Sequence, residues 1–98
     1  MSTPADQPQL VRLRVAAEAV RLPPARVRRY VRAGLVRPAG LDGADVLFGE
    51  PELRRLRKIR RLRHDLGINQ AGVEVVLRLL DQIDTLRSQL SDRPGTGR

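Results

Sequence analysis

Two adjacent prolines, Pro23 and Pro24, set the first fixed boundary in this 98-residue sequence. Proline disfavours helical geometry in the residue before it and lacks a backbone N–H, so a first helix must end near Leu22. The second proline suits the first turn of a new helix, and Gly34 is a suitable left-handed end for that helix. Apolar residues at helical spacing precede the prolines, namely Val15, Ala16, Ala19 and Val20. The pattern predicts two short helices joined by a tight turn, which is a helix-turn-helix.

A glycine-rich segment follows the second helix. Residues 35–49 contain three glycines and one proline, which is typical of turns rather than of a helix. We expect a small β-hairpin, or wing, in which Val46, Leu47 and Phe48 pair back to residues 35–36.

Two longer helices are predicted after the wing. Pro51 suits the first turn of a third helix, which should continue to about Leu66 before Gly67 ends it. Asn69 is a good N-cap for a last helix that should extend to about Leu90.

The core must be built mainly from aliphatic side chains, because Tyr30 and Phe48 are the only aromatic residues. Such a composition suits helices packed on helices better than a β-sandwich. The expected fold is mainly α, a winged helix-turn-helix with a small β-wing and a C-terminal coiled-coil dimerisation helix. The predicted divisions are a disordered N-terminus (1–9), the winged helix-turn-helix domain (10–67), the dimerisation helix (68–90) and a disordered tail (91–98).

The charge is unevenly placed along the chain. The net charge is +8, and residues 1–63 hold 15 Lys+Arg against 6 Asp+Glu, which gives +9, whereas residues 64–98 hold 4 against 5, which gives −1. This asymmetry indicates an anion-binding part joined to a separate partner-binding part. The alternative explanation of the high arginine content is that the genome uses arginine on every solvated face of its proteins. There is no cysteine, which excludes disulfides and thiol-based metal or redox sensing.

The second helix is predicted to have one cationic and one apolar face. At 100° per residue, Arg28, Arg29 and Arg32 fall on one side, opposite the apolar residues 27, 30 and 31. Arginine is well suited to bidentate contacts with phosphates or with guanine. Tyr30 lies next to the boundary, where its hydroxyl would reach a backbone phosphate. The alternatives are a core tyrosine with a solvated hydroxyl and arginines that are simply hydrated.

The third helix is predicted to carry a basic stripe. Seven of the ten residues 54–63 are basic, and close like charges cost energy unless an anion offsets them. The alternative is a solvated face. The stripe consists of Arg54, Arg57, Lys58 and Arg61, and the opposite, apolar side consists of Leu53, Leu56, Ile59, Leu62 and Leu66.

The last helix is predicted to pair with a second subunit. Its apolar residues recur at three- and four-residue steps, and so small a domain has little surface with which to cover them. The alternative is that this stripe packs against its own domain. The predicted interface residues are Val73, Val76, Leu77, Leu80, Ile83, Leu86 and Leu90.

Neither catalysis nor metal binding has support in the sequence. His64 is the only histidine, and a coiled-coil flank explains Asp81 and Asp84 better than an active site does. No glycine-rich phosphate loop or metal-ligand spacing is present, so we expect no enzyme, cofactor or metal. No apolar run approaches the roughly 18 residues of a membrane span, and the N-terminus lacks the regions of a signal peptide. The expected location is the cytoplasm.

The stretch ARVRRYVRAGLVRP, residues 25–38, resembles the recognition-helix segment of MerR-type regulators. Val27, Arg28, Tyr30, Gly34 and Leu35 match that family pattern. Residue 26 departs from it, being arginine in place of a hydroxyl residue, and residue 29 is arginine in place of an aromatic one. The resemblance covers about residues 10–90 and implies a winged-helix protein that binds DNA and regulates transcription.

A second motif resembles a narrower branch of that family, which contains HspR-type heat-shock repressors and CbpM-type chaperone modulators. In both types a Leu-Gly-Ile/Val-Asn-x-Ala-Gly segment opens the last helix, as residues 66–72 do here. The resemblance therefore implies one of two functions. The repressors bind operator DNA, whereas the modulators bind and inhibit a J-domain co-chaperone.

The wing and the charge favour different members of this branch. DNA-binding wings of the family carry arginines where this chain has Val46-Leu47-Phe48-Gly49, which favours the modulator. The strongly basic first two-thirds favours DNA, because J-domain surfaces that bind partners are typically basic and would repel it.

We therefore expect a dimeric, sequence-specific transcriptional regulator bound to double-stranded DNA at an inverted-repeat operator, with the J-domain modulator as the alternative. A chaperone partner or the dimerisation equilibrium would supply regulation. The expected DNA-binding residues are Arg26, Arg28, Arg29, Tyr30, Arg32, Arg54, Arg57, Lys58 and Arg61.

Overall fold

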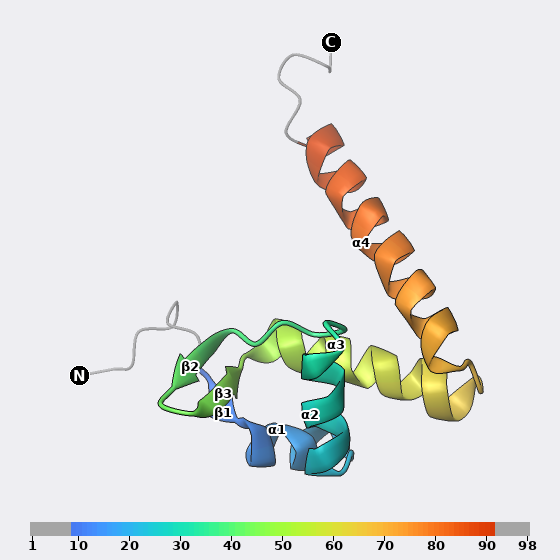
Figure 1. Cartoon of the computed structure of the whole chain (residues 1–98). Helices are drawn as coiled ribbons and strands as arrows, with labels where there is room; N and C mark the ends of the chain where they lie inside the picture. Colours follow the sequence, from blue (N-terminus) through green and yellow to red (C-terminus); the bar gives the residue numbers. More distant parts are fainter. Residues whose placement is uncertain (1–8, 92–98) are drawn as a thin grey trace.

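The computed structural model describes residues 9–91, so the predicted disordered segments lie outside the described residues except for positions 9 and 91. The chain is mainly helical, with a small antiparallel sheet, as predicted (Figure 1). The elements in order are β1 (Val11–Arg12), α1 (Leu13–Val20), α2 (Pro24–Arg32), β2 (Gly40–Asp42), β3 (Asp45–Phe48), α3 (Glu50–Arg60), the π-helix η1 (Arg61–Asp65) and α4 (Gln70–Ser91). None of the helices within residues 9–91 is long and apolar enough to cross a membrane.

The predicted helix-turn-helix is formed by α1 and α2. Arg21 ends α1 in the left-handed conformation, with φ 61°, and Pro24 opens α2. At the other end of α2, Gly34 has φ 78°, which a residue without a Cβ adopts at little cost. The N–H of Leu35 then donates to the carbonyl of Tyr30 over 3.0 Å, which completes the cap.

The wing forms, but its pairing differs from the prediction. The strand order is β1-β3-β2, and β3 pairs with β2 and with β1, so the predicted pairing with residues 35–36 is wrong. A two-residue turn with Gly43 at φ 65° joins β2 to β3, and such a short closure costs less entropy than a longer loop. Leu35 and Val36 instead insert into the core.

The third helix begins and ends near the predicted residues but changes character in its last turn. The N–H of Gly49 donates to Oε1 of Glu52 over 2.8 Å and so caps the start of α3. After residue 60 the helix widens into η1, and Gly67 follows with φ 69°. This widening changes the helical phase, and Leu66 is 63% exposed rather than on the buried side as predicted.

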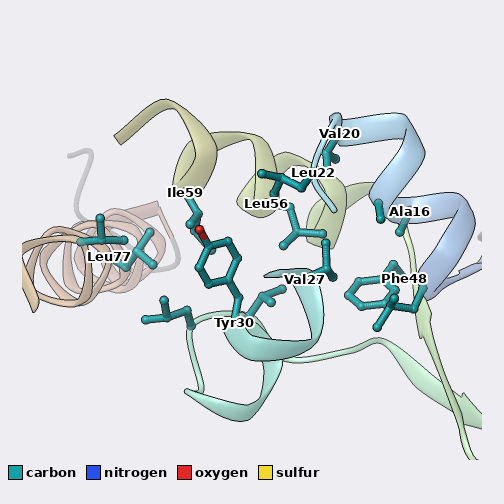
Figure 2. Packing of buried hydrophobic residues seen from close by; sticks show 14 residues of the cluster. Ala16, Val20, Leu22, Val27, Tyr30, Phe48, Leu56, Ile59 and Leu77 are labelled. Carbon is teal, nitrogen blue, oxygen red and sulfur yellow. The ribbon is translucent and has the colours of Figure 1, made fainter. Parts of the chain in front are cut away.

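A single core joins the four α-helices to the sheet (Figure 2). Phe48 from β3 is fully buried, and α4 contributes Val73 and Leu77, so the first two turns of the long helix belong to the domain. Beyond them α4 projects away from the remainder of the chain (Figure 1). The buried residues are Leu13, Ala16, Ala17, Val20, Leu22, Val27, Tyr30, Leu35, Val36, Phe48, Leu56, Ile59, Val73 and Leu77.

Contacts at the junction before α4 explain why the Gly-Ile-Asn-x-Ala-Gly segment has these residues at this spacing. Oδ1 of Asn69 accepts a hydrogen bond from the N–H of Gly72 over 2.8 Å, which confirms Asn69 as the N-cap. A Cβ on Gly72 would lie 2.6 Å from Cγ2 of Ile68, which packs against the core. Nη1 of Arg63 donates to the Ile68 carbonyl over 3.1 Å and holds the turn.

Candidate nucleic-acid interface

The arginine face of α2 lies in solvent, as its helical phase predicts. Arg28, Arg29 and Arg32 are exposed, whereas Val27 and Tyr30 on the opposite side are buried. The three arginines form none of the ion pairs or side-chain hydrogen bonds found within residues 9–91. Three positive charges on one helix therefore remain available to an anion outside the chain.

Tyr30 does not share that face. Its side chain is only 2% exposed, and its ring packs in the core with the hydroxyl directed toward Ile59 (Figure 2). The prediction that Tyr30 contacts a phosphate is therefore wrong, because its side chain lies in the core and not on the arginine face, and the alternative of a core tyrosine applies.

Arg26 lies at the first turn of α2 and bonds within the chain. Its Nη1 lies 2.8 Å from Nε2 of His64, and because a guanidinium only donates, this imidazole nitrogen is the acceptor. The contact ties the start of α2 to η1. Arg26 is partly buried, which leaves it a smaller free surface than Arg28 or Arg29.

A groove separates α2 from the wing. Arg28 and Arg32 line one side of it, and the wing contributes Asp42 and Asp45 on the other. Both carboxylates are ion-paired with Arg12 of β1, Asp45 at 3.7 Å from Nη1. The wing therefore presents a partly neutralised acidic edge beside the arginine face and offers no basic side chain of its own from residue 39 to 49.

The basic stripe of α3 forms as predicted and borders a different hollow. Its four members, Arg54, Arg57, Lys58 and Arg61, are exposed. Glu50 pairs with two of them, at 3.8 Å from Arg54 and 3.4 Å from Arg57. Arg54 and Lys58 line a hollow opposite Asp81 and Asp84 of α4, and this hollow shares no residue with the groove beside the wing. The arginines of α2 and the stripe of α3 therefore line different hollows.

The long helix has two distinct faces. At 100° per residue, Val73, Leu77, Asp81 and Asp84 fall within about 80° of arc and face the domain. This burial removes Val73 and Leu77 from the predicted dimer interface, because their side chains are already covered by their own chain. A second apolar face is centred about 140° away. It consists of Val76, Leu79, Ile83, Leu86 and Leu90, of which the last four are exposed.

Comparison with known proteins decides the family. The model of the MerR HTH family of regulatory proteins matches residues 11–92, which include every helix and strand described above. The chain belongs to the MerR HTH family. The predicted resemblance is confirmed, and the matched family is a regulatory one rather than a family of enzymes.

One relative supports the narrower placement in the HspR-like branch. This MerR-family chain is 32% identical over 87 residues to a Streptomyces coelicolor protein that carries the name heat shock protein HspR. The match covers 89% of the chain and 57% of the relative, so the chain spans little more than half the length of that protein.

Two functional residues of this MerR-family chain are not identified by the sequence patterns above. Leu79 is not among the predicted interface residues, although the steps of three, four, three and four residues from Val76 to Leu90 are a heptad pattern that identifies it. In the sequence, Arg55 is one member of the basic run 54–63. Its guanidinium bonds to both the loop after α2 and α4, a role that no local pattern predicts because the partners are 20 and 26 residues away.

Proposed function

We propose that this chain is a transcriptional regulator that binds double-stranded DNA in a sequence-specific manner as a homodimer. The observation that carries the proposal is the exposed arginine face of α2. Three guanidinium groups without partners in the described chain stand on the second helix of a helix-turn-helix, the element that enters the major groove in such motifs.

Base reading is assigned to Arg28 and Arg32, with Arg29 beside them. A guanidinium forms two parallel hydrogen bonds with O6 and N7 of guanine, a pattern that the major groove presents uniquely. The same side chains also neutralise phosphates.

The α3 stripe has a secondary part in this proposal. Arg57 and Arg61 would contact phosphates without reading sequence. Glu50 already offsets Arg57, and Asp81 and Asp84 face Arg54 and Lys58, so we expect each stripe residue to contribute less than an α2 arginine.

A second copy of the chain is proposed to cover the free face of α4. Leu79, Ile83, Leu86 and Leu90 are 51%, 43%, 58% and 63% exposed, a continuous apolar stripe that water solvates poorly. Helices with this heptad spacing pair by interlocking their apolar side chains. Twofold symmetry in the dimer then requires an operator with an approximate inverted repeat.

The wing favours a second candidate, a modulator that binds a J-domain protein. Its edge carries Asp42 and Asp45 and an exposed Leu41 instead of phosphate-binding arginines, a surface better suited to a protein than to DNA.

Binding to two partners separates these functions. Fluorescence anisotropy would measure binding to DNA from the region upstream of the chain's own gene, over a series of salt concentrations, alongside binding to a purified J-domain. A preferred sequence with a steep fall of affinity in salt is the result expected of a regulator. Tight J-domain binding with no sequence preference in DNA would reject the regulator in favour of the modulator.

A further inference from the structure

We propose that Arg55 is a positioning residue that fixes the angle at which α4 leaves the winged-helix domain, and so sets which operator spacing the dimer accepts. The inference deepens the proposed function and rests on it. It concerns a residue outside the arginine face of α2, at a contact between three segments of the chain.

The guanidinium of Arg55 forms three hydrogen bonds in two directions. Nε donates to the carbonyl of Leu35 over 2.6 Å, and Nη1 and Nη2 donate to Oδ1 and Oδ2 of Asp81 over 2.8 Å and 3.1 Å. The pair with Asp81 is bidentate, a planar arrangement that restrains orientation as well as distance. The Arg55 side chain is 29% exposed, so the surrounding chain holds it in place.

The Leu35 carbonyl connects this contact to the DNA-reading helix. Leu35 follows Gly34 directly, and its N–H donates to the Tyr30 carbonyl at the end of α2. Its side chain is buried, so the carbonyl cannot shift without moving the C-terminal turn of α2. Arg55 therefore links the end of the DNA-reading helix to α4.

Asp81 lies where α4 leaves the domain. Leu77, one turn earlier, is the last fully buried residue of the helix, and residues 81–91 are all exposed. No side chain of α4 beyond Asp81 forms a hydrogen bond or ion pair with the domain among residues 9–91. The ion pair is thus the outermost polar attachment of the helix.

A small change of angle at this point has a large effect at the end of the helix. Ser91 lies ten positions after Asp81, which is about 15 Å along the helix at 1.5 Å per residue. A tilt of about 20° would move that end by about 5 Å, more than the rise of roughly 3.4 Å between successive base pairs. Restraining the tilt is therefore necessary if the two DNA-reading helices of a dimer are to select one half-site spacing.

The test is an operator series in which the distance between half-sites changes one base pair at a time. The parent chain should prefer one spacing. Arg55→Lys keeps the charge but cannot form the bidentate pair, and Asp81→Asn removes the charge of the partner. Each variant should lose about tenfold in affinity for the operator with that spacing. This estimate treats the two copies of the ion pair in the dimer as worth about threefold each. At other spacings we expect little change, so the preference becomes flat.

Asp84→Asn is the matched control, because it removes the same charge from the same face of α4 at a residue with no ion pair among residues 9–91. It should keep the parent's spacing preference. If Arg55→Lys fails to fold, as judged by circular dichroism, Asp81→Asn carries the test, since its side chain is 53% exposed. An unchanged spacing preference in folded Arg55→Lys or Asp81→Asn would overturn the proposal.

A second measurement does not depend on DNA. The chain has no cysteine, so spin labels attach only at introduced sites, here Ala44→Cys in the wing turn and Thr85→Cys on α4. Labelled chain diluted into unlabelled chain reports the distance within one subunit by pulsed electron resonance. Arg55→Lys should broaden that distance distribution, and an equally narrow one would contradict the positioning role. If the parent chain binds no operator, the proposed function fails while this measurement still decides the role of Arg55.

Discussion

Leu77→Ala and Leu79→Ala are the same chemical change two residues apart, and they should have different consequences. Leu77 is 2% exposed and lies in the domain core, whereas Leu79 is 51% exposed on the free face of α4. Truncating a buried leucine removes its transfer free energy and leaves a cavity, which costs about 2–5 kcal/mol. The same change at a surface position costs within about 0.5 kcal/mol of zero in the isolated subunit.

For Leu77→Ala the loss is a large part of the total free energy of unfolding, which is about 5–15 kcal/mol for a typical domain. At about 4–8 °C per kcal/mol for a chain near 100 residues, the thermal midpoint should fall by about 10 °C or more. Leu79→Ala should instead weaken the proposed dimer, so its effect should grow as the protein is diluted.

Urea unfolding followed by circular dichroism at a low and a high protein concentration separates the two effects. Leu77→Ala should lower the midpoint by a similar amount at both concentrations, and sedimentation should still detect its dimer when folded. The reasoning is refuted if Leu77→Ala leaves the midpoint unchanged at high dilution and acts only through association. The first two turns of α4 would then face a partner and not their own domain.

Three further changes test the junction and the arginine face. Gly72→Ala should destabilise the fold by about 1–2 kcal/mol despite the better helix propensity of alanine, because the new Cβ would clash with Ile68. Calorimetry should show that Ile68→Ala lowers the stability of the Gly72→Ala variant less than it lowers the stability of the parent chain. Equal losses in the two chains would contradict the clash. Asn69→Ala should cost about 1 kcal/mol in urea unfolding by removing the N-cap bond, and an unaltered midpoint would argue against that bond. Arg28→Ala should lower discrimination between operator and random DNA by about 1–3 kcal/mol, whereas Arg57→Ala should weaken the affinity for operator and for random DNA equally. If anisotropy titrations show that Arg28→Ala binds both DNAs as the parent does, α2 is not the helix that reads the sequence.

The helix boundaries followed from the sequence because they depend on local chemistry. Pro24 and Gly34 delimit α2, and Asn69 caps α4, each through a residue type whose backbone preference is strong. Helical phase likewise placed Arg28 in solvent and Val27 inside.

The errors arose where distant contacts decide the outcome. Periodicity identifies an apolar face but not what covers it, so Val73 and Leu77 were assigned to a partner when their own domain buries them. Tyr30 lies at the edge between two faces, and the packing of α2 determines on which side its ring falls. The pairing partner of β3 depended on which segment had free backbone groups beside it. Residues 35–36 are buried in the core, so β3 pairs with β2 instead.

The division of α4 into a covered start and a free end has a consequence for building chimeras of this protein. A fragment cut at Gly67 would lack Val73 and Leu77, and would leave a hydrophobic hole in the winged-helix domain. A foreign coiled coil is best grafted after Asp81, so that the transplanted segment starts where the native helix first stands clear of its own subunit. The boundary between the winged-helix domain and the exchangeable coiled coil therefore lies in the middle of α4 and not at the loop before it.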